Sequence, residues 1–347
     1  GWDVSIFTVL TPDQPSEWEG CSVYDINRRH EVIKSDWDVV LCLSEPDMLI
    51  GLPQEPLRVI SQQLNGFGYC QPGWSDQADL FFSPSQGHLD HHRQWIPDES
   101  KWHVVPDGCD PTLYEEGKKV PGRVIWVSSP DRGAHWLLSI WSKVKEAVPH
   151  ASLRIFYNLN AGNTEQFEPS SKEWSPDIIE LGNRYRYIKE ASRRLAPLGI
   201  ELVGSTSREG IRKEFNEAEV LAFSCDTVAW TEGFSITTLE ACAHRACPVI
   251  TSQDALGSIY GGVVPMVPAP IKDNLDEYTK LVIRALQDTE WRNEANDRCR
   301  KFALQHSWEK VVDRMLKIFW CHEKWDRDHK PIFFTNVDYF GNTGAYG

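Results

Sequence analysis

The 347-residue sequence contains no apolar run long enough to cross a membrane. A transmembrane helix needs about 20 predominantly apolar residues in succession, whereas polar or charged residues interrupt every apolar run here after a few positions. No signal-peptide pattern opens the sequence. We therefore expect a cytoplasmic protein without a transmembrane segment, for which peripheral contact with a membrane surface remains open.

An excess of positive charge is also missing. Lys and Arg number 36 against 50 Asp and Glu, which gives a formal net charge of −14. General binding to nucleic acid depends on many Lys and Arg contacts with phosphates, so we expect no nucleic-acid partner. A local basic pocket for one phosphorylated ligand is still compatible with this balance.

The regular cysteine spacing of a disulfide framework is absent. The nine cysteines are an odd number and are scattered along the chain. Several lie inside apolar runs, namely Cys42, Cys225, Cys242 and Cys247. This distribution predicts buried free thiols in a reducing compartment.

A complete set of metal ligands is not found either. His88 and His92 in the segment HLDHHR are four residues apart, as zinc ligands on a helix can be. No cluster of cysteines or carboxylates completes the set. The sequence therefore favours a solvent-exposed helix face at these histidines and no metal site.

What the sequence does contain is an alternation of short apolar runs and helical patterns. Hydrophobic residues make up 41% of the chain, as in soluble globular proteins, and the length predicts about two domains. Strands are expected at 3–9, 38–44, 57–63, 79–85, 102–108, 123–129, 153–159, 200–206, 220–224, 247–252 and 263–267. Helices are expected at 133–149, 183–196, 208–218, 236–245, 274–287, 289–305 and 307–325. This order predicts an α/β protein with two doubly wound, Rossmann-like domains facing a central cleft.

The boundaries follow from the same pattern. The first domain is expected over residues 1–108, and the polar segment 109–122, with its Pro and Gly residues, is expected to be a linker. The second domain is expected over 123–305. Residues 306–347 are expected to form a helix and a tail that cross back to the first domain.

The stretch TEGFSITTLEAC, residues 231–242, predicts a ligand site. It follows an apolar strand, Gly233 allows a tight turn, and Ser235 is a favourable N-cap for a helix that begins at Ile236. A helix N-terminus has unpaired N–H groups and a partial positive charge, so it binds anions. Glu232 and Glu240 flank it with carboxylates that accept hydrogen bonds from hydroxyls. A ligand with both phosphate and sugar groups suits this arrangement.

From about residue 100 to residue 315, the order of motifs resembles that of retaining nucleotide-sugar glycosyltransferases with the two-domain GT-B fold, family 4 in particular. The motifs are VPDGCDP, SSPDRG, LRIFY, the two-glutamate stretch, CPVITS and HSWEKVVDRM. The resemblance implies a hexosyltransferase that moves a sugar from a nucleotide-diphosphate sugar to the hydroxyl of a glycan, lipid-linked or small-molecule acceptor, with retention and without a cofactor or metal.

The resemblance also implies residue roles. Glu232 binds the hydroxyls of the donor sugar at the catalytic centre, and Glu240 binds the ribose of the nucleotide. Arg132 neutralises the diphosphate leaving group. The backbone amides of Gly233, Phe234 and Ser235 hold the sugar and the diphosphate.

The sequence departs from the family at three points. Ser129 takes the first of two positions that often carry cations, so that Arg132 fills only the second. The first domain starts without the usual strand and glycine-rich loop. Where the family often has a histidine, this chain has Gln62, Gln63 and Asn65, whose roles stay open. A non-catalytic protein that binds a nucleotide sugar or serves as a partner subunit is therefore the alternative interpretation.

Overall fold

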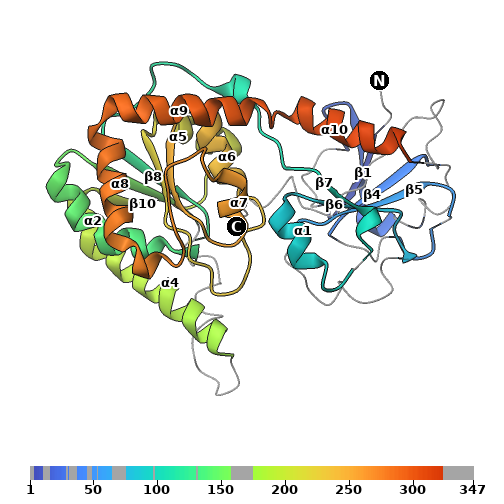
Figure 1. The fold of residues 1–347 in the computed structure, drawn as a ribbon, viewed down its shortest axis with the longest axis horizontal. Helices are drawn as coiled ribbons and strands as arrows, with labels where there is room; N and C mark the ends of the chain where they lie inside the picture. The colour runs from blue at the N-terminus through green and yellow to red at the C-terminus, as the bar shows by residue number, and fades with distance from the viewer. Residues whose placement is uncertain are drawn as a thin grey trace. The chain divides into compact units, whose positions relative to one another are not determined.

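The computed structural model describes residues 4–10, 16–28, 30, 37–44, 49–52, 54–64, 76–96, 98–129, 132–157 and 175–322. These residues fall into two compact units (Figure 1). The first unit contains the described residues up to Asp107 together with those from Glu309 onward. The second unit consists of Gly108–Trp308.

The second unit is built on a six-stranded parallel sheet. Its strands are β8 (Arg123–Val127), β9 (Ser152–Phe156), β10 (Ile200–Leu202), β11 (Val220–Phe223), β12 (Cys247–Thr251) and β13 (Met266–Val267). Their order in space is β10-β9-β8-β11-β12-β13, and every neighbouring pair is parallel. The order runs outward from β8 in both directions, so it reverses between β8 and β11, as in doubly wound dinucleotide-binding folds.

Helices cover both faces of this sheet (Figure 1). They are α2 (Ala134–Ala147), α4 (Pro176–Leu195), α5 (Arg208–Glu217), α6 (Ile236–Ala243), α7 (Leu256–Tyr260), α8 (Leu275–Gln287) and α9 (Thr289–Leu304). The core between these layers contains fully buried Trp126 of β8 and Trp141 of α2. Because both faces are covered, the strands are continuously apolar rather than alternating, which explains why the sequence predicts them well.

Helix α4 begins seven residues earlier than the sequence predicts, at Pro176 instead of residue 183. Ser175 caps it, since its side chain accepts a hydrogen bond from the Ile178 amide. Proline is also favourable at the first helical position, where no amide donor is needed.

The first unit contains two separate sheets. Strands β4 (Val39–Leu43), β5 (Leu57–Ser61), β6 (Leu80–Ser83) and β7 (Trp102–Val104) form a parallel sheet in that order. Strand β1 (Ser5–Thr8) lies parallel to β3 (Cys21–Asp25), which pairs antiparallel with β2 (Glu17–Trp18). The sequence did not predict β2 and β3, which are short and largely polar.

Helix α10 (Trp308–Trp320) packs against the four-stranded sheet of the first unit. Val311 and Phe319 enter the core beside Leu57 and Phe82, and the rings of Phe82 and Phe319 stack with centroids 5.8 Å apart. The segment 109–122, predicted as a linker, lies within the second unit. Lys119 anchors it there by donating hydrogen bonds to three backbone carbonyls, among them that of Phe215 at 3.0 Å.

The expectation of an exposed helix face at His88 and His92 is wrong. Both lie on α1 (Gln86–His92) and are fully buried, with their rings stacked 4.2 Å apart. The helix packs this face against β6, where His88 Nδ1 lies 2.8 Å from the hydroxyl of Ser83. Burial lowers the pKa of His88 to about 3 and also lowers the pKa of His92, so both are neutral near pH 7. Across the described ranges, no three His, Cys, Asp or Glu side chains gather as a metal site.

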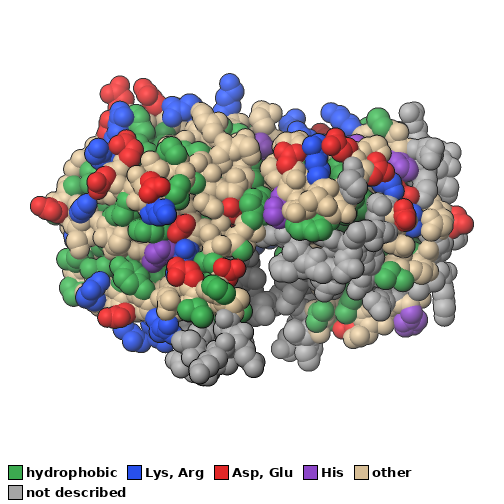
Figure 2. All heavy atoms as spheres, turned by 60° about the horizontal axis from the view of Figure 1, so that its bottom comes forward, with side chains coloured by type: hydrophobic (Ala, Val, Ile, Leu, Met, Phe, Trp, Pro, Cys, Tyr) green, Lys and Arg blue, Asp and Glu red, His purple; other side chains and the backbone are tan. Residues whose placement is uncertain are grey.

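Two surface properties bear on function. None of the helices in the described part of the chain combines the length and apolarity needed to cross a membrane. On the face drawn in Figure 2, acidic and basic side chains are interspersed rather than separated by sign. The four cysteines predicted in apolar runs are buried thiols outside disulfides, as expected.

Candidate functional site

The reversal of strand order between β8 and β11 locates a candidate site. In open α/β sheets, the loops after two strands at such a reversal diverge, and ligands bind in the crevice between them. Here the loop after β8 carries Ser129 and Arg132, and the loop after β11 carries Ser224 and Asp226. The topology therefore points to the same loops as the sequence motifs.

A glycine allows these two loops to touch. Gly133 has a φ of +120°, and a Cβ atom added there would lie 1.9 Å from the carbonyl oxygen of Ser224. The Ser224 hydroxyl donates a hydrogen bond to the Gly133 carbonyl at 2.8 Å. The Asp226 amide likewise donates to the Arg132 carbonyl at 2.8 Å. Backbone contacts thus fix the position of Arg132 beside the loop after β11.

Two predicted site residues meet at this point. Nη1 of Arg132 donates a hydrogen bond to Oε2 of Glu232 at 2.9 Å. The Glu232 side chain is only 6% exposed, whereas that of Arg132 is 22% exposed. The carboxylate is therefore largely shielded from water, and the guanidinium that balances its charge still has access to solvent.

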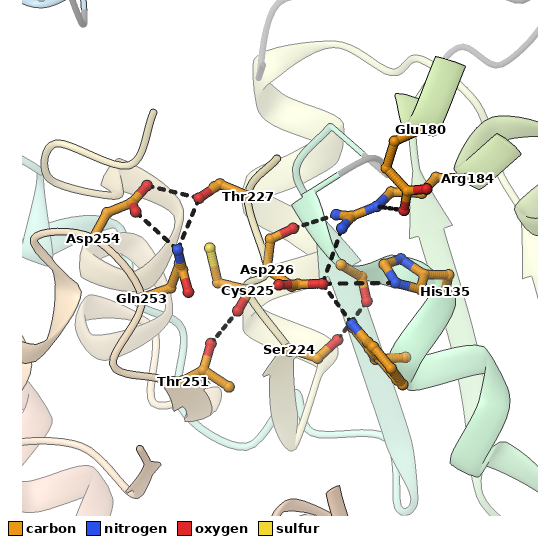
Figure 3. A network of polar contacts seen from close by, with 12 residues as sticks. His135, Glu180, Arg184, Ser224, Cys225, Asp226, Thr227, Thr251, Gln253 and Asp254 are labelled. Carbon is orange, nitrogen blue, oxygen red and sulfur yellow. Dashed lines mark hydrogen bonds and ion pairs between the residues drawn. The ribbon is translucent and has the colours of Figure 1, made fainter. Parts of the chain in front are cut away.

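Asp254 holds the backbone that carries Glu232. Figure 3 shows the contacts of Asp254 with Thr227 and Gln253. Its Oδ2 accepts hydrogen bonds from the hydroxyl of Thr227 and from the amides of Thr231 and Glu232, each at 2.9 Å. Its Oδ1 accepts from the Gln253 side chain at 2.9 Å. Asp254 itself has a φ of +50°, an uncommon conformation for a residue with a side chain.

Sequence reasoning missed Asp254. The available signal was the polar run SQD (252–254), which begins at the last residue of the strand predicted at 247–252. Polar residues after a buried parallel strand lie at its carboxyl end, where sites form in this class of fold.

The start of α6 follows the sequence prediction. The helix begins at Ile236, and the hydroxyl of Ser235 accepts a hydrogen bond from the Thr238 amide, which confirms the predicted cap. Ser235 has φ +70° and ψ 80°, and the Tyr260 hydroxyl donates to its carbonyl at 2.9 Å. A left-handed conformation at a residue other than glycine costs about 1–3 kcal/mol and is often found at functional sites.

Gly233 and Phe234 connect Glu232 to this cap, and both are buried. Glu240 lies one turn further along α6 and is half-buried. Burial, and then the negative charges of Glu240 and Asp110, raise the pKa of the Cys109 thiol to about 12.

A second polar network surrounds Asp226 (Figure 3). Its Oδ2 accepts a hydrogen bond from the Trp136 indole at 2.7 Å and pairs with Arg184 of α4 at 3.1 Å. Glu180 binds the other side of Arg184 at 2.9 Å. His135 lies 3.8 Å from the same Asp226 oxygen, and burial lowers the pKa of His135 to about 4, so it is neutral. This network fixes α4 and the start of α2 to the loop after β11.

At Ser129, where the resemblance implies that one cation is missing, two hydroxyl groups lie close together. Ser129 is buried, and its Oγ lies 3.2 Å from the hydroxyl of Tyr185 on α4. The Arg184 side chain, next in sequence to Tyr185, is directed to Asp226. The sequence did not indicate that α4 approaches the loop after β8.

The two glutamines of the first unit bond to groups nearby in the chain. The Gln62 side chain donates to the Leu64 carbonyl at 2.8 Å, and the Gln63 side chain donates to the Ser61 hydroxyl at 3.2 Å. His88 Nε2 also lies 3.3 Å from the Leu64 carbonyl. Asn65 lies outside the described residues.

No family model matches the sequence, and no curated protein matches it. Solved structures do match. The sucrose-phosphate synthase from Thermosynechococcus elongatus aligns with a TM-score of 0.65 at 15% identity, over 92% of this chain and 89% of that one. AviGT4, a glycosyltransferase involved in avilamycin A biosynthesis, aligns with a TM-score of 0.63 at 15% identity, over 92% and 97%.

A trehalose-6-phosphate synthase, studied for enzymatic glycosyl transfer with retention, aligns with a TM-score of 0.62 at 9% identity, over 90% of this chain and 92% of that one. Together with the two parallel sheets, these matches confirm the predicted fold class, an α/β protein with the GT-B glycosyltransferase fold. At such low identities they establish the fold alone.

Proposed function

We propose that the chain is a retaining glycosyltransferase that moves a sugar from a nucleotide-diphosphate sugar to an acceptor hydroxyl. The observation that carries this proposal is the ion pair between Arg132 and Glu232 at the strand-order reversal of a GT-B fold. It places a cation and a carboxylate where this class of sheet binds ligands.

Arg132 has the role of binding the diphosphate. When the bond between sugar and phosphate breaks, negative charge grows on the leaving group, and fixed cations and N–H donors stabilise it. A guanidinium has five N–H donors and can bind a carboxylate and a phosphate together. The N-terminus of α6, with the amides of Gly233, Phe234 and Ser235, supplies further donors and a partial positive charge.

The two glutamates have the role of binding hydroxyls. Glu232, next to Arg132, accepts hydrogen bonds from the donor sugar, and Glu240, on α6, accepts them from the ribose. In the reaction, the acceptor oxygen bonds to the anomeric carbon as the bond to phosphate breaks. The acceptor proton passes to the leaving phosphate, which guides the attack onto its own face and so retains the configuration. The neighbour studied for transfer with retention supports this stereochemistry.

The test is donor turnover by the purified chain. UDP-, ADP- and GDP-sugars are incubated with the protein, with and without candidate acceptors, and release of the nucleoside diphosphate is measured. We expect one donor to be used, the product to keep the donor's anomeric configuration by NMR, and activity to survive EDTA. An inverted product contradicts retention, and activity that EDTA abolishes and Mg²⁺ or Mn²⁺ restores contradicts the metal-free mechanism.

The second candidate is a non-catalytic protein that binds a nucleotide sugar or serves as a partner subunit. The pairing of Ser129 with Tyr185 favours it, because hydroxyls stand where the resemblance implied a second cation. Calorimetry separates the candidates. Binding of a nucleoside diphosphate without turnover of any donor, alone or with candidate partner chains, supports the second.

A further inference from the structure

A surface pocket of about 620 Å³ opens in the first unit, here named the α10 pocket. It lies where the amino ends of β6 and β7 meet the last turns of α10. Leu80 of β6 and Ile318 of α10 contribute apolar surface to it. Its volume falls within the range of about 300–1,000 Å³ that is usual for small-molecule sites.

Positive side chains line this pocket. Lys101 reaches it from the segment before β7, and Arg314 and Lys317 reach it from α10. The imidazoles of His103 and His322 line it as well. Within the described ranges, neither Arg314 nor Lys317 forms an ion pair with a carboxylate.

Backbone carbonyls hold two of these cations in place. Nζ of Lys101 donates a hydrogen bond to the Ala78 carbonyl at 3.1 Å, and Nη1 of Arg314 donates to the Val104 carbonyl at 3.4 Å. A carbonyl orients a cation without neutralising it. The positive charge of Arg314 therefore remains to act on a ligand.

The carboxylate that borders the α10 pocket is already balanced. Asp79 forms an ion pair at 3.2 Å with Arg58, and the side chains are 13% and 4% exposed. The Arg58 amide also donates to Asp79 at 2.9 Å. In a chain with a net charge of −14, the pocket is thus a local concentration of positive charge.

We propose that the α10 pocket binds a small soluble phosphorylated molecule. Phosphate oxygens pair with Arg314 and Lys317, and the uncharged part of the ligand contacts Leu80 and Ile318. The pocket shares no residue with the site around Arg132 and Glu232, so this proposal is independent of the proposed function.

The concave shape favours a soluble ligand over a membrane. A bilayer surface is bound by cations that project outward from a flat or convex face. In the α10 pocket the cations line a hollow, which suits a phosphate group that can enter it.

Cys321 provides a local reporter. It lines the α10 pocket and is exposed, whereas the other described cysteines are buried or, for Cys21, half-buried. The rate at which Cys321 reacts with the dianionic disulfide 5,5′-dithiobis(2-nitrobenzoate) is measured with and without pyrophosphate, and peptide mass analysis identifies the modified residue. We expect pyrophosphate to slow the reaction at Cys321. Calorimetry in an Arg132→Ala background then measures pyrophosphate affinity without the proposed diphosphate site.

Charge reversal tests the assignment. Arg314→Glu with Lys317→Glu should weaken pyrophosphate binding by about tenfold or more, equivalent to about 1.4 kcal/mol, and abolish the protection of Cys321. Lys280→Glu with Lys301→Glu changes the net charge equally, on exposed positions of the second unit, and should leave both readouts unchanged. The milder pair Arg314→Gln and Lys317→Gln is used if the reversed variant has a lower melting temperature.

Three outcomes overturn the proposal. Pyrophosphate fails to protect Cys321 in the wild type, or protection persists when Arg314 and Lys317 are replaced, or the control pair weakens binding as strongly as the pocket pair. Sedimentation with phosphatidylglycerol vesicles is measured in parallel. Vesicle binding that depends on Arg314 and Lys317, without protection by pyrophosphate, assigns the surface to a membrane instead.

Discussion

Arg132 and Glu232 are joined by a hydrogen bond of 2.9 Å, although 100 positions separate them in the chain. One follows β8 and the other follows β11, the two strands between which the sheet reverses its order. Glu232 is nearly buried, so its charge depends on this guanidinium. The two side chains therefore cannot be replaced independently of each other.

The first prediction is strong coupling between these residues. In a double-mutant cycle, Arg132→Ala and Glu232→Ala should each reduce donor turnover, by about 10²–10³ in rate if each removes a stabiliser of the leaving group or its partner. The double variant should lose less than the product of the two losses, with a coupling energy of about 0.5–3 kcal/mol. Strictly multiplicative losses in kcat/KM would show that the ion pair has no role in the reaction.

The second prediction concerns Glu240 and the nucleotide. Glu240→Ala should weaken binding of the bare nucleoside diphosphate by about 1–3 kcal/mol, because a hydroxyl shielded from water loses its acceptor. Calorimetry with the matching deoxyribose nucleotide supplies the control, since that ligand should not distinguish the variant from the wild type. Equal affinity of the folded variant for the ribose nucleotide removes Glu240 from the site.

The third prediction concerns Asp254, which positions the backbone of Glu232 through Oδ2. Asp254→Asn keeps the size but weakens the acceptor shared by three donors. Donor turnover should fall while affinity for the bare nucleoside diphosphate stays the same, because the sugar side of the site is displaced. Asp276→Asn, at an exposed position of the same unit, is the control. A parallel loss of nucleotide affinity contradicts a role confined to Glu232.

The fourth prediction is a stability test at the contact between the two loops. Gly133→Ala should destabilise the second unit by more than about 2 kcal/mol, because the new methyl group overlaps the Ser224 carbonyl and the backbone is left-handed. Gly117→Ala is the matched control, since Gly117 has a φ of +77° but open space around its Cβ position. Chemical denaturation measures the free energy of unfolding of both variants. The difference between their losses separates the steric overlap from the cost of placing alanine at a positive φ. Equal losses of unfolding free energy in the two variants would show that the contact with the Ser224 carbonyl does not exclude a methyl group.

The fifth prediction concerns acid stability. Burial lowers the pKa of His88 to about 3, while an unfolded histidine titrates near 6.5. Between these values the unfolded chain binds a proton that the folded chain does not. Stability from this residue is therefore present above pH 6.5 and is lost as the pH falls toward 3, by about 1.4 kcal/mol per pH unit.

Thermal melting between pH 7.5 and 4.5 measures this slope. His88→Asn should flatten it, because asparagine can form a hydrogen bond with the Ser83 hydroxyl without taking up a proton. His150→Asn, at an exposed position, should leave the slope unchanged. An equally steep slope in the His88 variant would show that other groups cause the loss of stability in acid.

The candidate site illustrates what a single sequence can predict. The cap at Ser235 and the start of α6 were predictable because they depend on a few neighbouring residues. Asp254 was not, because its importance comes from three donors 22 to 27 positions away, which only the fold brings to it. The histidines of α1 were misjudged for a related reason. Their composition is that of an exposed helix, and only packing against β6 shows that they are neutral and buried.

By itself, the sequence determined the alternation of strands and helices, the parallel sheet of the second unit and the segment that carries Glu232 and Glu240. Those features arise from apolar runs and local caps, whose energetics involve residues close together in the chain. Tertiary structure alone decided that Arg132 pairs with Glu232, that a Tyr185 hydroxyl meets Ser129, and that the α10 pocket gathers Lys101 and Arg314 from opposite parts of the chain. Such contacts depend on strand order and helix packing, which bring together residues that no local pattern connects.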